Sequence, residues 1–119
     1  MENKEFSKKL EERTKAFSIR IIRLSTNLPN TVEGRIIRNQ FTKAGTSIGA
    51  NYREANRARS KADFSNKIKI CESEANETCY WLEIIEELKW TETKELESAL
   101  KEANELLAIF TSIGKNLKL

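Results

Sequence analysis

Between Phe64 and Ile85 the sequence reads FSNKIKICESEANETCYWLEII, and its apolar residues recur at alternating steps of four and three. This spacing puts them on one stripe of a helix and is typical of the seam in a helix bundle. Ser60 is a candidate N-cap for this helix, and Asp63 is favourably placed at the positive end of its dipole. We therefore predict a long amphipathic helix that begins at Ser60. Its stripe consists of Phe64, Ile68, Cys71, Ala75, Thr78, Leu82 and Ile85.

Three further segments carry comparable stripes. The first runs from about residue 6 to residue 28 and stops at Pro29, because proline disfavours helix at the residue before it. The second spans about residues 31–56, with Asn30 as its candidate N-cap. The last follows the short polar link 90–93 and is expected to end at Gly114. The three stripes are Leu10, Phe17, Ile21, Leu24 and Leu28; Ile37, Phe41, Ala44, Ile48, Tyr52 and Ala55; and Leu96, Leu100, Ala103, Leu107 and Phe110.

The connections between these four helices are short, so neighbouring helices must run antiparallel. Only four glycines and one proline occur in 119 residues, which favours long uninterrupted helices. We predict an all-α protein, an antiparallel up-and-down four-helix bundle that forms a single domain over residues 1–119.

The sequence also indicates a cytoplasmic location without membrane contact. No segment approaches the roughly 18 consecutive apolar residues that a membrane span needs. The polar start, residues 1–5, runs into no apolar stretch of the kind found in signal peptides. Cys71 and Cys79 lie about 12 Å apart along one helix, too far for a disulfide.

Catalysis is not expected. The chain has no histidine, which removes Ser-His and Cys-His pairs and the histidine ligands of di-iron bundles. No glycine-rich phosphate loop occurs, and the carboxylates of residues 72–87 are interpreted as solvated or ion-paired groups. We predict no enzyme activity, no catalytic residue, no cofactor and no metal site.

The stretch Gly45 to Glu54 is the most specific local motif. Gly45 and Gly49 share one helix face, and glycine in a helix costs up to about 1 kcal/mol, so they suggest close approach of a neighbouring backbone. Ser47, Asn51 and Glu54 form a polar line beside the apolar stripe. Such a line can fix helix register or subunit geometry, or it can contact a ligand.

Positive charge is concentrated in the first part of the chain. Residues 1–70 hold 16 Lys and Arg against 7 Asp and Glu, whereas residues 71–119 hold 5 against 11. Arginine can bind phosphate with two hydrogen bonds, so these cations indicate RNA or DNA contact. They can equally form an ordinary charged face or dock an acidic protein. The candidate contacts are Arg35, Arg53 and Arg57, on one side of their helix, and Arg59 and Lys61 after it.

Several large apolar residues lie outside the stripes. A monomeric bundle would leave much of this surface in water, and exposed apolar patches usually mark interfaces. Self-association is therefore expected, unless the helices bury a wider arc than one stripe. The residues are Ile19, Ile22, Trp81, Ile84 and Leu88.

Residues 44–55, AGTSIGANYREA, resemble the Ser-x-x-x-Asn-x-x-Glu signature of the bacterial four-helix-bundle proteins encoded in 23S rRNA intervening sequences, sometimes labelled S23 ribosomal protein. The similarity continues through SKADF at 60–64 and ESEANET at 72–78, and covers about residues 15–115. It implies a ring-like homopentamer and kinship with the accessory protein of diversity-generating retroelements, a basic pentamer that binds a reverse transcriptase and nucleic acid. Ser47, Asn51 and Glu54 match the signature, whereas Tyr52-Arg53 departs from its usual small apolar pair.

Overall fold

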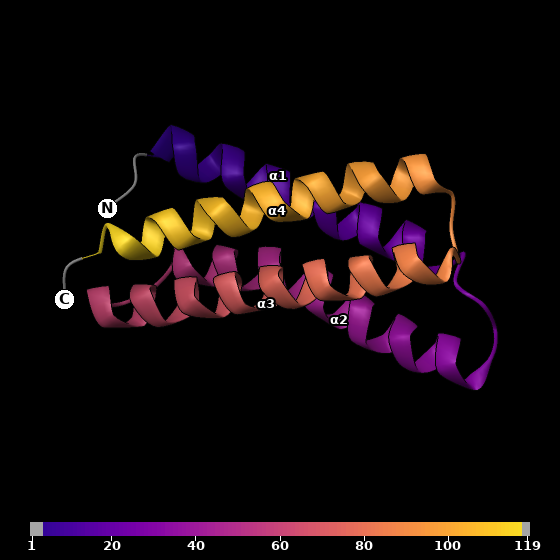
Figure 1. Cartoon of the computed structure of the whole chain (residues 1–119). Helices are drawn as coiled ribbons and strands as arrows, with labels where there is room; N and C mark the ends of the chain where they lie inside the picture. Colours follow the sequence, from indigo (N-terminus) through magenta and orange to yellow (C-terminus); the bar gives the residue numbers. More distant parts are fainter. Residues whose placement is uncertain (1–3, 118–119) are drawn as a thin grey trace.

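The computed structural model describes residues 4–117 as four helices: α1 (Lys4–Ser25), α2 (Val32–Ala55), α3 (Lys61–Leu88) and α4 (Thr93–Lys115). Successive helices run in opposite directions, and the prediction of an all-α, up-and-down bundle is confirmed (Figure 1). We call the end where α1 begins and α4 ends the terminal end, and the other the distal end. Residues 1–3, part of the polar start considered above, and residues 118–119 lie outside the described residues.

Side-chain caps fix the starts of α2 and α3. Ser60 has an extended backbone, and its hydroxyl accepts a hydrogen bond from the Asp63 amide at 3.0 Å, as predicted. The prediction of Asn30 as the cap of α2 is wrong. Thr31 is the extended residue, so its hydroxyl reaches back to the Gly34 amide at 3.0 Å, and Asn30 instead accepts from the Arg35 side chain.

The ends of α1 and α4 also differ from expectation. α1 ends at Ser25, because the amides of Asn27 and Leu28 bond three residues back and tighten the chain into a turn before the proline. Gly114 does not end α4, which continues to Lys115 with Gly114 in ordinary helical conformation. Within residues 4–117 the non-glycine residue with positive φ is Lys89, at the end of α3.

The predicted stripes of α1 and α3 are fully buried, as is that of α2 apart from the half-buried Ile37. In α4, however, Ala99 and Leu106 are buried and Leu100 and Leu107 are only half-buried. Ala99 and Leu106 lie three and four residues from Glu102, which contacts α1, so they share its face of the helix. The buried stripe of α4 is thus rotated toward α1.

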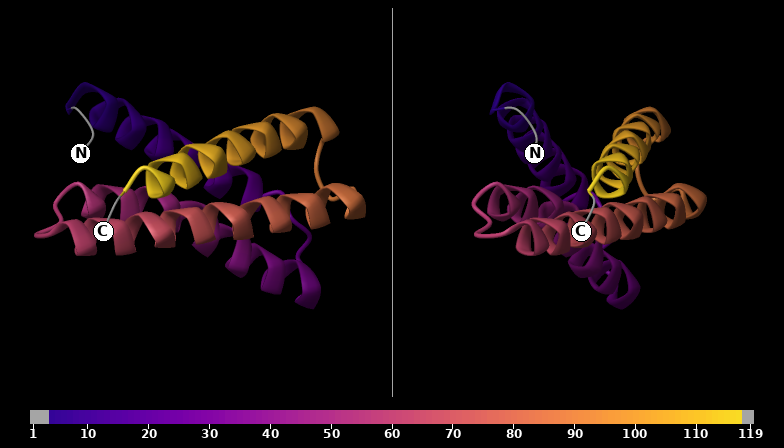
Figure 2. Two further views of the ribbon diagram at one scale, coloured as in Figure 1. Left: turned by 60° about the vertical axis from the view of Figure 1, so that its left-hand side comes forward. Right: turned by 90° about the vertical axis from the view of Figure 1, so that its left-hand side faces the viewer.

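The bundle is open on one side. Each helix packs extensively on the next along the chain, but α1 and α4 touch little and diverge above the α2–α3 pair (Figure 2). Arg13 links them, because its guanidinium donates to both carboxylate oxygens of Glu102 and to Glu105, each at 2.7 Å. The hydrogen bond to Glu102 raises the pKa of Arg13. Arg13 therefore has a structural role, which is to join α1 to α4.

Arg38 has a comparable structural role at the distal end. Its guanidinium donates to the backbone carbonyls of Ser25 at 3.1 Å and Leu28 at 2.7 Å, and so holds the end of α1 against α2. Carbonyls at a helix end lack partners within the helix. Arg38 supplies these partners from the neighbouring helix.

Replacing Arg38 with methionine is expected to lower the free energy of unfolding by about 2 kcal/mol, because the hydrocarbon stem stays while the charged donors are lost. Urea unfolding followed by circular dichroism measures this. Arg35→Met is the matched control, since Arg35 is exposed and bonds only weakly to Asn30. Its expected effect is within about 0.5 kcal/mol. Equal losses in the two variants would contradict the assignment.

Candidate nucleic-acid interface

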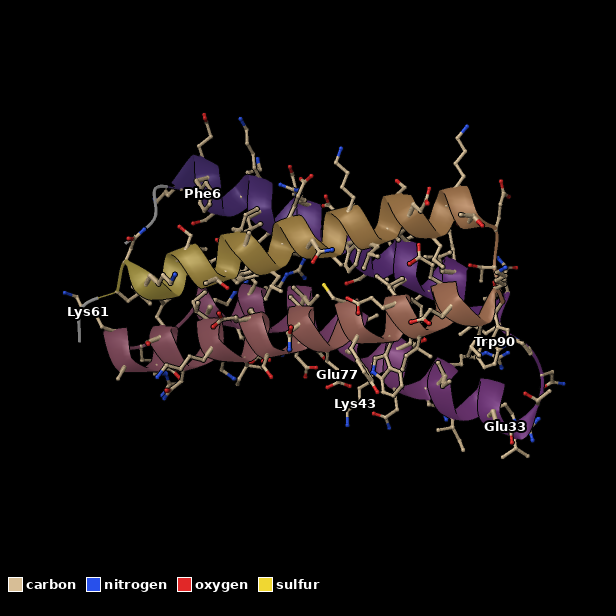
Figure 3. The ribbon with its side chains drawn as sticks, viewed as in Figure 1. Phe6, Glu33, Lys43, Lys61, Glu77 and Trp90 are labelled. Atoms are coloured by element: carbon tan, nitrogen blue, oxygen red, sulfur yellow. The ribbon has the colours of Figure 1, made fainter. Side chains whose placement is uncertain are left out.

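Four of the predicted contact residues gather where α2 passes into α3. Arg53 occupies the last turn of α2, Arg57 and Arg59 lie in the link, and Lys61 is the first residue of α3. The link is short because the amides of Arg57 and Ala58 bond three residues back, each at 3.0 Å. All four cationic side chains are exposed. They lie at the terminal end, where Figure 3 shows Lys61.

Two lysines of α1 join this group. Lys4 and Lys8 are one helical turn apart, and together with Arg59 and Lys61 they line a pocket of about 600 Å³, which we call the corner pocket. The antiparallel fold explains this, because the start of α1 lies beside the end of α2. We call the six cations Lys4, Lys8, Arg53, Arg57, Arg59 and Lys61 the basic corner.

Little acid neutralises the basic corner. Arg53 approaches one oxygen of Glu11 at 3.8 Å, and the other oxygen of Glu11 accepts a hydrogen bond from Asn56 at 2.8 Å. Among residues 4–117, no salt bridge forms to Arg57, Arg59 or Lys61. The corner therefore keeps a net positive charge.

Arg35 does not belong to this group. It lies in the first turn of α2, about 27 Å along the helix from Arg53 at 1.5 Å per residue. Figure 3 shows Glu33, two residues earlier, at the distal end with Trp90 and away from Lys61. The two arginines share a side of the helix, as the sequence indicated, but not a site.

The glycines of the central motif lie where α2 meets α1. A Cβ atom on Gly45 would stand 2.7 Å from two side-chain carbons of Ile21, the methylene Cγ1 and the methyl Cγ2. On Gly49 it would stand 3.2 Å from the hydroxyl of Thr14 and 3.3 Å from its backbone carbon. A side chain at position 45 would therefore require Ile21 to shift, and one at position 49 would require Thr14 to move by a few tenths of an ångström.

The polar line of the motif is satisfied mostly within α2. Ser47 donates to the carbonyl of Lys43 at 2.6 Å, and Asn51 donates to the carbonyl of Ser47 at 2.8 Å. Glu54 accepts from Lys67 of α3 at 2.8 Å, and this hydrogen bond raises the pKa of Lys67. Within residues 4–117, Glu54 is thus the member of the line that bonds to another helix.

Several carboxylates of α3 have structural partners. Glu72 accepts a hydrogen bond from the Thr111 hydroxyl at 2.6 Å, and Glu77 accepts one from the Trp81 indole at 3.0 Å. Burial raises the pKa of Glu74. Among residues 4–117, no cluster of acids and thiols has the geometry to hold a metal ion, and no helix is long and apolar enough to cross a membrane.

The large apolar residues outside the stripes lie at the surface. Ile19, Ile22 and Leu88 are exposed, at 42%, 46% and 47%, and Trp81 and Ile84 are half-buried. Val32 and Ile36 of α2, which the sequence did not single out, are 58% and 57% exposed. Large apolar side chains are therefore exposed on the distal halves of α1, α2 and α3.

The model of the 23S rRNA-intervening sequence protein family matches residues 7–112. The chain belongs to this family. A crystal structure at 1.70 Å of a protein with unknown function from the S23 ribosomal protein family, from Bacteroides thetaiotaomicron, is similar to it with a TM-score of 0.82 and 38% identity. The similarity covers 89% of this chain and 98% of that chain. No curated protein matches the chain.

The residues that match the family model include most of the basic corner. Lys8 and the four cations of the α2–α3 corner fall within residues 7–112, whereas Lys4 precedes them. Sequence reasoning missed both lysines. The predicted topology could have identified them, because an up-and-down bundle brings the start of the first helix beside the end of the second.

Proposed function

We propose that the protein is a homo-oligomeric, cytoplasmic and non-enzymatic scaffold that binds nucleic acid, RNA in the first place, through the basic corner. The observation that carries this proposal is the meeting of six cations from α1, the end of α2, the link and α3. Among residues 4–117, Arg53 is the one of the six that lies within 4 Å of a carboxylate. Guanidinium and ammonium groups bind phosphates, and such contacts supply most of non-specific affinity. The distant Arg35 is left out of this interface.

Base-specific recognition is not part of the proposal. Single-stranded RNA is read by stacking its bases on aromatic side chains. Phe64 is the aromatic residue that lines the corner pocket, and it is 4% exposed. The corner is therefore expected to bind phosphates with little dependence on sequence.

Binding of a structured RNA is expected to be strongly salt-dependent. If about four phosphates are contacted, the logarithmic salt slope is about −3, and affinity falls roughly 50-fold between about 50 and 200 mM salt. Fluorescence anisotropy with a labelled RNA measures this slope. Absence of binding at low salt would refute the proposed function.

Assembly is the second part of the proposal, supported by the exposed apolar surface on α2 and α3. Light scattering is expected to give a mass well above the 13.7 kDa of one chain, and five times that mass for the homopentamer that the family resemblance implies. The double variant Ile36→Glu and Leu88→Glu is expected to shift the mass toward 13.7 kDa, because charge in an apolar interface is costly. A single 13.7 kDa species from the unmodified chain at micromolar concentration would contradict assembly.

A protein-interaction adaptor is the second candidate, favoured by an apolar groove next to the corner. Phe6, Ile109, Ile113 and Leu117 line this groove of about 540 Å³, which meets the corner pocket at Phe64. An acidic protein could place apolar side chains there and carboxylates on the cations. Recovery of one protein partner after nuclease treatment, with no RNA affinity, would favour this function. Kinship with the retroelement accessory protein would be compatible with either candidate.

A further inference from the structure

We propose that the corner pocket holds the phosphorylated end of a nucleic-acid strand. This rests on the proposed function and assigns separate tasks to the cations. Arg53 and Arg57 do not line the pocket and would contact the strand backbone, whereas Lys4, Lys8, Arg59 and Lys61 surround the hollow. A positively charged groove can also hold a continuous backbone, and comparison of strands with and without a terminal phosphate distinguishes the two arrangements.

The size and shape of the pocket suit one terminal nucleotide. Its volume of about 600 Å³ lies within the range of about 300–1,000 Å³ found for small-ligand sites. Its lining draws two lysines from α1 and Arg59 and Lys61 from the α2–α3 corner. A terminal phosphate in the pocket would lie within reach of cations from both segments.

The charge of the pocket favours a phosphate monoester over a diester. A terminal monoester carries about −1.5 to −2 at neutral pH, close to twice the charge of a backbone phosphate. Among residues 4–117, one carboxylate lines the pocket, that of Glu11, which is already bonded by Asn56 and lies 3.8 Å from Arg53. The first turn of α3, which begins beside Ser60, also brings the positive end of a helix dipole, which the carboxylate of Asp63 in the same turn partly offsets.

The other residues that line the pocket would contact the sugar and base of the terminal nucleotide. Ala58 of the lining is half-buried and supplies apolar surface, whereas Ala55 and Phe64 are buried beneath it. Asn56 and Ser60 bring polar groups that are already bonded, to Glu11 and to the Asp63 amide. Apolar surface of this kind can accept a ribose or the edge of a base without distinguishing the four bases. The selectivity of the pocket is therefore for the chemical state of the strand end.

The test compares short oligouridylates of one length that end in a 5′-phosphate, in a 3′-phosphate, or in hydroxyls at both ends. Fluorescence anisotropy of the full-length protein at low salt is expected to show roughly tenfold tighter binding of one or both phosphorylated strands. Comparison of the 5′ and 3′ arms identifies which end the pocket takes.

Two double variants distinguish binding of the strand end from binding of the strand backbone. Lys8→Gln with Arg59→Gln is expected to abolish the preference for a phosphorylated end, while the hydroxyl-ended strand loses less than the phosphorylated one. Lys94→Gln with Lys101→Gln is the matched control, because it removes the same charge from exposed positions on α4 and should keep the preference. Melting temperatures verify that each variant is folded.

The outcomes are distinguishable. Equal binding of all three strands would overturn the end-binding inference and leave the proposed function standing. A preference for the phosphorylated end that survives Lys8→Gln with Arg59→Gln would likewise overturn the assignment to this pocket. Absence of binding to every strand would refute the proposed function, and the inference with it.

Discussion

Replacing Gly45 with valine is expected to lower the free energy of unfolding by about 3 kcal/mol, on the order of a hundredfold in the folding equilibrium. The first added carbon would stand 2.7 Å from Cγ1 and Cγ2 of Ile21, well inside van der Waals contact. Ile21 is fully buried, and its β-branched side chain has few rotamers, so it has little freedom to move away. Urea unfolding at a fixed protein concentration measures the loss.

A matched glycine tests whether the loss comes from the helix contact. A Cβ on Gly114, which also lies inside a helix, would meet Ile68 at 3.9 Å, an ordinary contact. Gly114→Ala is therefore expected to stabilise the protein by up to about 1 kcal/mol, because alanine favours helix over glycine. Gly45→Ala has the same gain in helix propensity but should still destabilise.

Exchanging the large and small residues at positions 21 and 45 tests whether their contact limits the size of residue 45. Ile21→Ala removes the two nearest of the three carbons that would meet the new side chain and keeps the Cβ at 3.1 Å. Alone it is expected to cost about 2–5 kcal/mol by leaving a cavity. Combined with Gly45→Val, the loss should be clearly smaller than the sum of the two single losses, since each change compensates the other. Strict additivity would show that Ile21 does not limit the size of residue 45.

Residue spacing was enough to predict the bundle and most of its core. A stripe with heptad spacing leaves one arrangement for a helix of α3's length, which is to bury that stripe against other helices. The buried stripe of α4 was harder to predict, because Leu100 and Leu106 are equally apolar and lie on opposite flanks of Ala103. Leu106 is buried because it lies on the side of α4 that faces α1. The spacing of residues along α4 does not show where α1 lies.

The sequence alone did not show which cations share a surface, because charge does not reveal the partner of a side chain. The sequence shows eight arginines of similar local surroundings. The fold gives Arg13 two glutamates and Arg38 two backbone carbonyls, each from a distant segment. It also adds Lys4 to the basic corner from more than fifty residues away. Tertiary packing thus sets which cations can meet a ligand.

Charge reversal at Arg53 and Arg57 is expected to weaken RNA binding on the order of a hundredfold at low salt. Both residues are exposed cations of the basic corner, and each reversal replaces an attraction to phosphate with a repulsion. Loss of two phosphate contacts should also reduce the logarithmic salt slope by about 1.4 for a single strand. A change in slope distinguishes loss of contacts from a general loss of folded protein.

The control must carry the same net charge. Arg53→Glu with Arg57→Glu removes four units from the net charge of +3, giving −1, and Lys94→Glu with Lys101→Glu does the same on α4. Glutamate at position 53 would face Glu11, but at exposed positions such repulsion costs little stability. If affinity depends on total charge alone, both double variants will lose it equally, and the basic corner is then not the interface. A selective loss in the Arg53 and Arg57 variant, with an unchanged melting temperature, would place the phosphate contacts at the junction of α2 and α3.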